Sequence, residues 1–141
     1  MITAANRLRK HADYQRVYKA SRKRFGKQMS YFFLLRQPEL LRENSTLRQP
    51  DACARIGLTV SRAMGNAVQR NRIKRRMREA VRREIGTLQL PVDVVLHPGR
   101  RVAEVEFSLL ERDIAHIFHA IQREAAEQLR GPGVHATRGS A

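Results

Sequence analysis

This sequence of 141 residues is poor in several residue types and patterns, and each shortage excludes a class of protein. It has one cysteine, Cys53, so no internal disulfide can form. No apolar run approaches the roughly 18 residues that a transmembrane helix needs. The first residues contain no apolar stretch of the kind that a signal peptide carries. We therefore expect a cytoplasmic protein without a membrane partner.

Acidic residues are also scarce: 13 Asp and Glu stand against 28 Lys and Arg, which leaves a formal net charge of +15. Such an excess repels itself in a compact chain, so a polyanionic partner is its natural explanation. The hydrophobic content of 42% is typical of a folded domain and not of a disordered basic tail. The length fits one RNA-binding domain, which we place at residues 1–128, followed by a disordered tail at 129–141.

Hydrophobic periodicity predicts a mixed α/β domain. Helical spacing extends over three stretches, residues 6–20, 66–85 and 108–129, whereas strand patterns occupy residues 30–36, 55–61 and 92–97. Ser108 and Glu111 have the spacing of a capping box at the start of the last helix. Residues 21–27 are a basic stretch, residues 37–53 read as a long loop and residues 62–65 as a short turn. The order of the elements favours a two-layer α/β (α+β) sandwich.

The helix predicted over 66–85 has one narrow apolar side and an unusual density of positive charge. The apolar side consists of four residues: Ile73, Met77, Ala80 and Val81. Between Arg62 and Arg83 the only acidic residue is Glu79, whereas an ordinary solvated helix face includes many acidic partners. Like charges four residues apart destabilise an isolated helix, so a phosphate-binding face explains this pattern better.

Three adjacent motifs of this region resemble the protein component of bacterial ribonuclease P. They are Gly57-Leu58-Thr59-Val60-Ser61, Gly65-Asn66-Ala67-Val68 and Arg70-Asn71-Arg72-Ile73-Lys74-Arg75. The family's hallmark is an Arg-Asn-Arg box on a helix that follows a Gly-Leu-x-Val-Ser strand. The flanks agree, with aromatic residues at 14 and 18, an apolar strand after Pro91 and a last amphipathic helix. The resemblance covers roughly residues 6–125.

The resemblance implies both a fold and a function. The fold is a mixed four-stranded sheet with three helices and a left-handed βαβ crossover, similar to the second domain of ribosomal protein S5. The function is that of an accessory subunit of a ribonucleoprotein endonuclease that removes the 5′ leader of precursor tRNA. Catalysis and Mg²⁺ would belong to the RNA subunit, and the protein would bind no cofactor itself. The expected partners are the ribonuclease P RNA and precursor tRNA.

Eight residues are our candidates for RNA contacts: Arg62, Asn66, Arg70, Asn71, Arg72, Lys74, Arg75 and Arg78. Two features depart from the family's pattern. Ala63 follows Arg62 where the family usually has a second basic residue. The loop over 38–53 is longer than typical, and nothing in the resemblance explains it.

Tyr14, Tyr18 and Phe33 are candidates for stacking on unpaired bases. The two tyrosines are four residues apart and therefore share one helix face. Phe33 lies in a strand whose two faces are both apolar, so one of them can line a cleft. The alternative is that all three rings are core residues. The resemblance implies that this helix and sheet face hold the single-stranded 5′ leader.

Signs of metal or nucleophile chemistry in the protein itself are weak. His116 and His119 have the spacing of metal ligands, but no third ligand stands nearby, and Cys53 has no neighbouring histidine. A carboxylate cluster of a metal nuclease is a further alternative, for which the candidates are Asp93, Glu104 and Glu106. That chemistry usually also uses a lysine close by, which this stretch lacks. We expect no catalytic and no metal-binding residue.

Two other functions share part of this pattern. A ribosomal protein or similar non-catalytic RNA-binding protein would have the same basic charge. A helix-turn-helix protein would need two adjacent helices, whereas here a strand precedes the basic helix. The Arg-Asn-Arg box after Gly-Leu-Thr-Val-Ser favours the ribonuclease P subunit over both.

Overall fold

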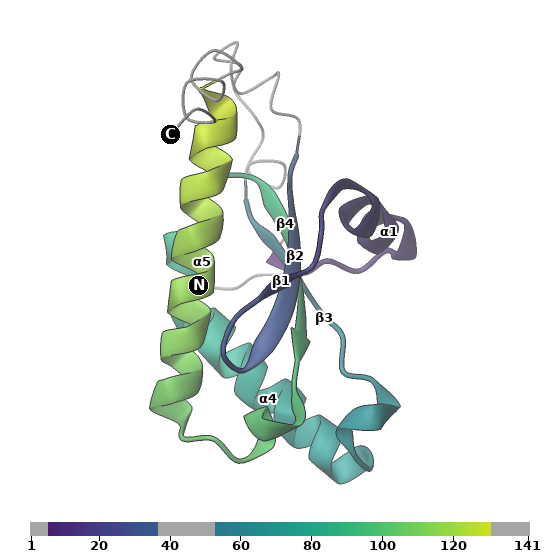
Figure 1. The fold of residues 1–141 in the computed structure, drawn as a ribbon. Helices are drawn as coiled ribbons and strands as arrows, with labels where there is room; N and C mark the ends of the chain where they lie inside the picture. The colour runs from purple at the N-terminus through teal and green to yellow at the C-terminus, as the bar shows by residue number, and fades with distance from the viewer. Residues whose placement is uncertain (1–5, 37–52, 131–141) are drawn as a thin grey trace.

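The computed structural model describes residues 6–36 and 53–130, which form a four-stranded sheet with helices on both faces (Figure 1). The helices and strands, in chain order, are α1 (His11–Ala20), β1 (Arg24–Phe25), β2 (Met29–Leu35), β3 (Arg55–Leu58), α4 (Ala67–Glu84), β4 (Val92–Pro98) and α5 (Phe107–Leu129). Short 3₁₀ turns form η2 (Arg62–Met64), η3 (Ile85–Thr87) and η4 (Arg100–Ala103). Over these residues no helix has the length and hydrophobicity to cross a membrane.

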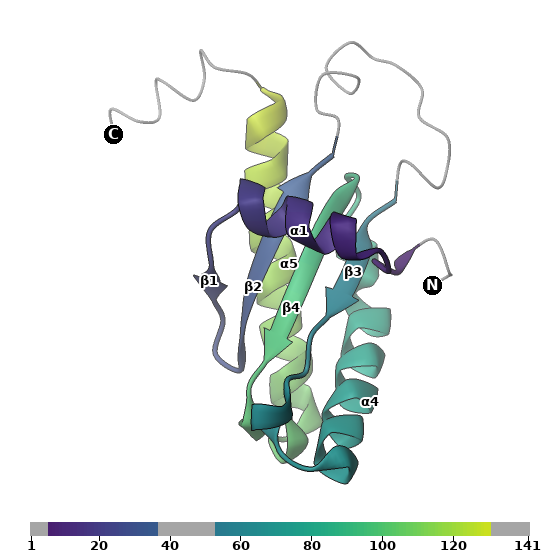
Figure 2. The same ribbon diagram turned by 90° about the vertical axis from the view of Figure 1, so that its right-hand side faces the viewer.

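The expected mixed sheet with three α-helices is confirmed within the described ranges. Helices α4 and α5 cover one face of the sheet, and α1 crosses the upper part of the other face (Figure 2). We call the face under α1 the outer face. Because α1 covers only part of it, the lower part of the outer face carries no α-helix of the described residues (Figure 2).

The strand order is β1-β2-β4-β3, in which β3 and β4 are parallel and the other neighbours antiparallel. Helix α4 connects β3 to β4. Figure 2 shows both strands pointing downward with α4 behind the sheet and β3 to the right of β4. Seen from the helix side with the strands pointing upward, β4 is then to the left of β3. The crossover is therefore left-handed, which confirms the expectation and departs from the strong general preference.

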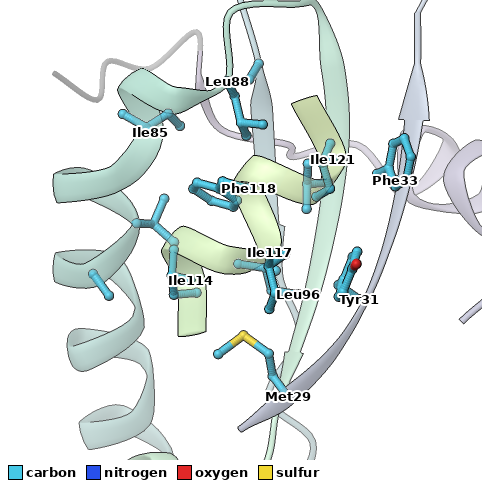
Figure 3. Packing of buried hydrophobic residues seen from close by; sticks show 14 of the residues in the cluster. Met29, Tyr31, Phe33, Ile85, Leu88, Leu96, Ile114, Ile117, Phe118 and Ile121 are labelled. Carbon is cyan, nitrogen blue, oxygen red and sulfur yellow. The ribbon is translucent and has the colours of Figure 1, made fainter. Parts of the chain in front are cut away.

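The main core lies between the sheet and helices α4 and α5 (Figure 3). From α4 it contains Ile73, Met77, Ala80 and Val81, and from α5 Leu110, Ile114, Ile117, Phe118, Ile121 and Ala125. The α4 set is the one that the helical periodicity predicts. A smaller cluster of Leu8, Val17 and Val95 lies between α1 and the outer face.

Helix α1 begins at His11, five residues later than the periodicity predicts. The cause is a long-range contact that local sequence does not reveal. Arg7 forms a parallel bridge with Ile56, and the Leu8 N–H donates to the Ile56 carbonyl at 3.0 Å. The residues just before α1 therefore run along the edge of β3.

Three other boundaries also differ from expectation. The predicted capping box is wrong, because α5 begins at Phe107 after the N-cap Glu106, without a side-chain cap, and Ser108 lies inside the helix. The basic stretch over 21–27 contains β1, which was not predicted. β3 ends at Leu58 and not at residue 61. Most of the expected loop over 37–53 and of the tail over 129–141 lies outside the described residues.

Candidate nucleic-acid interface

A reciprocal side-chain cap starts the basic helix α4. The Asn66 Oδ1 accepts from the Gln69 N–H at 2.9 Å, and the Gln69 Oε1 accepts from the Asn66 N–H at 2.9 Å. Gly65, immediately before, has a φ of 126°, a conformation that favours glycine. Asn66 therefore has a structural role in addition to the RNA contact expected for it.

The predicted RNA-contact residues lie together along the start of α4 and the preceding turn. Four α4 residues and one η2 residue are exposed: Asn71, Arg72, Arg75, Arg78 and Arg62. Arg70 and Lys74 are half-buried. We call these seven residues the basic strip.

Two arginines of α4 also connect the helix to the segment before α5. The Arg72 Nε donates to the Ala103 carbonyl at 2.6 Å, and the Arg76 Nη2 donates to the Val105 carbonyl. Substituting Arg72 therefore removes a tertiary hydrogen bond as well as a positive charge.

Arg100 is a functional candidate that sequence reasoning missed. Its Nη2 and Nε donate to the Ala63 carbonyl at 2.7 and 3.1 Å. A guanidinium thus lies beside Ala63, the residue that follows Arg62. No local signal could have shown this, because the two residues are 37 positions apart.

The end of α4 is less positive than its sequence suggests. The exposed Glu79 carboxylate accepts hydrogen bonds from Arg82, at 2.5 and 3.0 Å, and from Arg83 at 2.9 Å. These hydrogen bonds lower the pKa of Glu79 to about 2. Uncompensated positive charge is therefore concentrated in the first turns of α4.

Tyr14 and Tyr18 both contact the outer face, but over different strands. Tyr14 lies on β3, where a Cβ added to Gly57 would meet the Tyr14 hydroxyl oxygen at 2.6 Å. Only glycine at position 57 leaves room for this ring. The Tyr14 hydroxyl donates to the Leu8 carbonyl at 3.3 Å.

Tyr18 belongs to an aromatic cluster with Phe32 on β2 and His97 on β4. The Tyr18 and Phe32 rings meet edge to face, with centroids 4.9 Å apart. The Tyr18 hydroxyl and the His97 Nε2 are hydrogen-bonded at 3.0 Å. Burial, together with the charge of Lys23, lowers the pKa of His97. The imidazole is therefore neutral at pH 7.

Phe33 does not join this cluster, so its assignment to the same cleft as the tyrosines is wrong. Side chains alternate along a strand, and Phe33 points into the main core, where it is only 4% exposed (Figure 3). The aromatic residue of β2 on the outer face is Phe32. The sequence pattern could not distinguish the two, because both faces of β2 are apolar.

Two hollows lie beside these aromatic residues. The larger, of about 810 Å³, lies along the edge of β3 and includes Tyr14 with four arginines: Arg7, Arg9, Arg78 and Arg82. The smaller, of about 460 Å³, lies on the uncovered part of the outer face and includes His97, Thr59 and two lysines, Lys23 and Lys27. Both hollows thus combine basic groups with an aromatic or imidazole ring, as single-stranded nucleic acid requires.

The Asp93 side chain forms ion pairs with two arginines. Its carboxylate, which is fully buried, accepts from the Arg55 Nε and Nη2 at 2.8 and 2.7 Å and from the Arg36 Nη1 at 2.5 Å. Arg55 also pairs with Asp13 of α1 at 3.7 Å. Asp93 therefore helps attach α1 to the sheet and does not form a cluster with Glu104 and Glu106.

Across residues 6–36 and 53–130, no three His, Cys, Asp or Glu side chains are grouped as metal ligands would be. His116 and His119 are both exposed on α5. The chemistry that this surface supports is the binding of a polyanion with unpaired bases.

Comparison with known proteins agrees with these observations. The family model described as Ribonuclease P matches residues 2–122. The chain is 33% identical over 114 residues to the ribonuclease P protein component of Bacillus velezensis, covering 80% of this chain and 86% of that protein. It is 30% identical over 142 residues to that of Thermobifida fusca, covering 99% and 88%.

Solved structures show the same fold. The Staphylococcus aureus RNase P protein aligns with a TM-score of 0.63 at 23% identity, over 83% of this chain and 95% of that one. The Thermotoga maritima RNase P protein aligns with a TM-score of 0.64 at 22% identity, over 81% and 96%. With a family model that spans most of its length, this chain belongs to the ribonuclease P protein family.

Proposed function

We propose that this chain binds the RNA subunit of ribonuclease P through the basic strip and the 5′ leader of precursor tRNA through the outer face. Ribonuclease P is an endoribonuclease whose catalysis is carried by its RNA subunit. The contribution of the protein is then to bind both RNAs and to hold the scissile phosphate in place. The metal ions of the reaction, Mg²⁺ in this proposal, are held by RNA.

The separation of the two surfaces is the observation that carries this proposal. Six of the seven residues of the basic strip belong to α4, which packs on one face of the sheet, whereas Tyr14 and Tyr18 belong to α1 on the opposite face (Figure 2). Within the described residues, the two surfaces meet only at the edge of β3, where Arg78 and Tyr14 line the larger hollow. The strip offers guanidinium and ammonium groups without aromatic rings, which suits the phosphates of a folded RNA. The outer face offers aromatic rings, which suit unpaired bases.

Tyr18→Ala and Tyr14→Ala test the assignment of the leader. Each ring that stacks on a leader base should contribute about 1–3 kcal/mol to the affinity of the holoenzyme for precursor tRNA. Affinity for mature tRNA, which has no leader, should be unchanged, as should assembly with the RNA subunit. Phe107→Leu on α5, where the ring is partly buried away from the outer face, is a control for general destabilisation.

Equal losses of affinity for precursor and mature tRNA, together with a lower melting temperature, would show that the tyrosines serve the core alone. The leader would then have to bind elsewhere, and the proposed role of the outer face would be rejected.

A further inference from the structure

The hairpin formed by β1 and β2 displays an exposed aromatic ring beside the smaller hollow. Phe25 is 75% exposed, the same exposed fraction as Val68. No other large hydrophobic residue in the described parts of the chain is as exposed as these two. A single exposed hydrophobic residue needs no explanation by itself. What distinguishes Phe25 is how it is held and what surrounds it.

The hairpin is fixed to α5 by contacts from its turn. The buried Asp113 carboxylate accepts from the Lys27 N–H at 3.0 Å and from the Gln28 N–H at 2.8 Å. A Cβ on Gly26 would meet the Ile117 Cδ1 at 2.8 Å, so the turn packs directly on the helix. Arg24, next to Phe25, forms an ion pair with Glu124 of α5.

A ring presented by such a hairpin is already in place before a ligand arrives. Ordering a flexible loop or side chain at an interface weakens binding, and a rigid support removes that cost. Phe25 has the properties of a preformed contact for a flat ligand.

The strand register places Phe25 in one row with His97. Phe25 pairs with Ser30, and Ser30 pairs with His97, so all three lie side by side on the outer face. Two strand spacings separate Phe25 from His97, or about 10 Å. Both residues line the hollow of about 460 Å³, and His97 also contacts Tyr18.

The surroundings of Phe25 are cationic. The Lys23 Nζ lies 5.7 Å from the Phe25 ring centroid, and both Lys23 and Lys27 line the hollow. A base stacked on Phe25 would therefore have ammonium groups close to its phosphate. This combination of ring and cations is the one that binds single-stranded nucleic acid without reading its sequence.

We propose that Phe25 is a second stacking platform for the single-stranded 5′ leader, one row beyond the Tyr18–Phe32–His97 cluster. This inference rests on the proposed function, because it extends the path of the leader along the outer face. The leader is favoured over the RNA subunit because His97 belongs both to the hollow and to that cluster, whereas none of the α4 residues of the basic strip lines the hollow.

The test is a scan of the leader with abasic nucleotides, using the holoenzyme reconstituted with wild-type or Phe25→Ala protein. With the wild type, one abasic position should weaken the binding of precursor tRNA by about 5- to 150-fold, the range of base–aromatic stacking. With Phe25→Ala the intact leader should show the same loss, and the abasic change at that position should cost nothing more. Mature tRNA should bind both proteins equally.

Two further variants separate stacking from hydrophobicity. Phe25→Trp should keep the affinity, and Phe25→Leu should lose it, because only the former retains a flat π-face. Leu109→Ala, which removes another exposed hydrophobic side chain on α5, should leave the binding of precursor tRNA unchanged.

The outcomes distinguish this inference from the function on which it rests. If Tyr18→Ala weakens the binding of precursor tRNA but Phe25→Ala does not, the second platform is rejected and the proposed function stands. If neither variant has an effect, the proposed leader path itself is rejected. An equal loss for precursor and mature tRNA with Phe25→Ala would also reject the second platform, since Phe25 would then contact RNA outside the leader.

Discussion

Phe32 and Phe33 are neighbours in β2, yet their rings lie on opposite faces of the sheet. Phe33 packs in the main core, with the Arg24 guanidinium 4.8 Å from its ring centroid. Phe32 packs against Tyr18 on the outer face. Two chemically identical side chains therefore have different consequences when they are removed.

Phe33→Ala should destabilise the protein by about 3–5 kcal/mol, because it leaves a cavity in the main core. Binding of precursor and mature tRNA should then fall in parallel as the folded fraction falls. Phe32→Ala should cost less stability and should weaken precursor tRNA binding selectively. Urea unfolding and the two RNA affinities, measured on both variants, check this; a precursor-selective loss with Phe33→Ala would contradict it.

His97 should make leader binding depend on pH. The folded chain holds the pKa of His97 below its usual value of 6.5, so the unfolded chain takes up the proton at higher pH. Stability from this group is therefore complete above pH 6.5 and decreases as the pH falls toward the folded pKa. A leader phosphate near His97 would favour the protonated form and raise its pKa again.

The affinity for precursor tRNA, divided by the affinity for mature tRNA at the same pH, should accordingly be higher at pH 5.5 than at pH 7.5. His97→Asn should remove this difference, and Lys23→Gln should keep it. Affinities measured at constant ionic strength check the prediction, and a difference that survives in His97→Asn would assign it to another group.

At the scale of elements, α4 is the part of the molecule that the sequence predicts best. Its narrow apolar arc and its bounds, Ala67–Glu84 against the predicted 66–85, follow from local spacing, whereas the Asn66–Gln69 cap was not predicted. The start of α1 could not be predicted, because it depends on the bridge between Arg7 and Ile56. The sequence could not show which of Phe32 and Phe33 lies on the outer face, because this depends on which face of β2 the helices α4 and α5 cover.

Replacing Arg70, Arg72 and Lys74 with Ala should flatten the salt dependence of binding to the RNA subunit. Each lost phosphate contact should reduce the slope of log K against log salt by about 0.7 to 0.9. The matched control is Arg82→Ala with Arg83→Ala, because Glu79 already neutralises part of that charge. Thermal unfolding should accompany the measurement, since Arg72 also bonds to Ala103.

An equal reduction of the slope by the control pair would show that binding senses total charge and not the basic strip. An unchanged slope in the triple variant would place the electrostatic footprint on another surface, for which the arginines beside the larger hollow are the next candidates.

At the scale of the whole molecule, the protein without RNA should not cleave precursor tRNA at any Mg²⁺ concentration. The physical reason is that its buried carboxylates have structural partners: Asp93 binds two arginines, and Asp113 binds the hairpin turn. Addition of ribonuclease P RNA at low Mg²⁺ should restore cleavage. Site-specific cleavage by RNA-free protein, after controls for contaminating ribonuclease, would contradict the prediction.

The topology is the part of the fold that periodicity could not supply. Spacing predicts which segments are helices and strands, but not on which side of the sheet a connection passes. The left-handed crossover was expected only through the resemblance carried by the Gly57–Ser61 and Arg70–Arg75 motifs.

The handedness of that crossover determines which face of the sheet α4 covers, and therefore which face is left open for a second RNA. A right-handed connection would carry the 18-residue α4 across the front of the sheet, over the rows that hold Phe32, His97 and Phe25. The left-handed connection sends it behind the sheet, so that α1 is the only α-helix of the described residues on the outer face. Under the proposed function, the protein would then be a positively charged spacer that keeps two mutually repelling strands of phosphate a fixed distance apart.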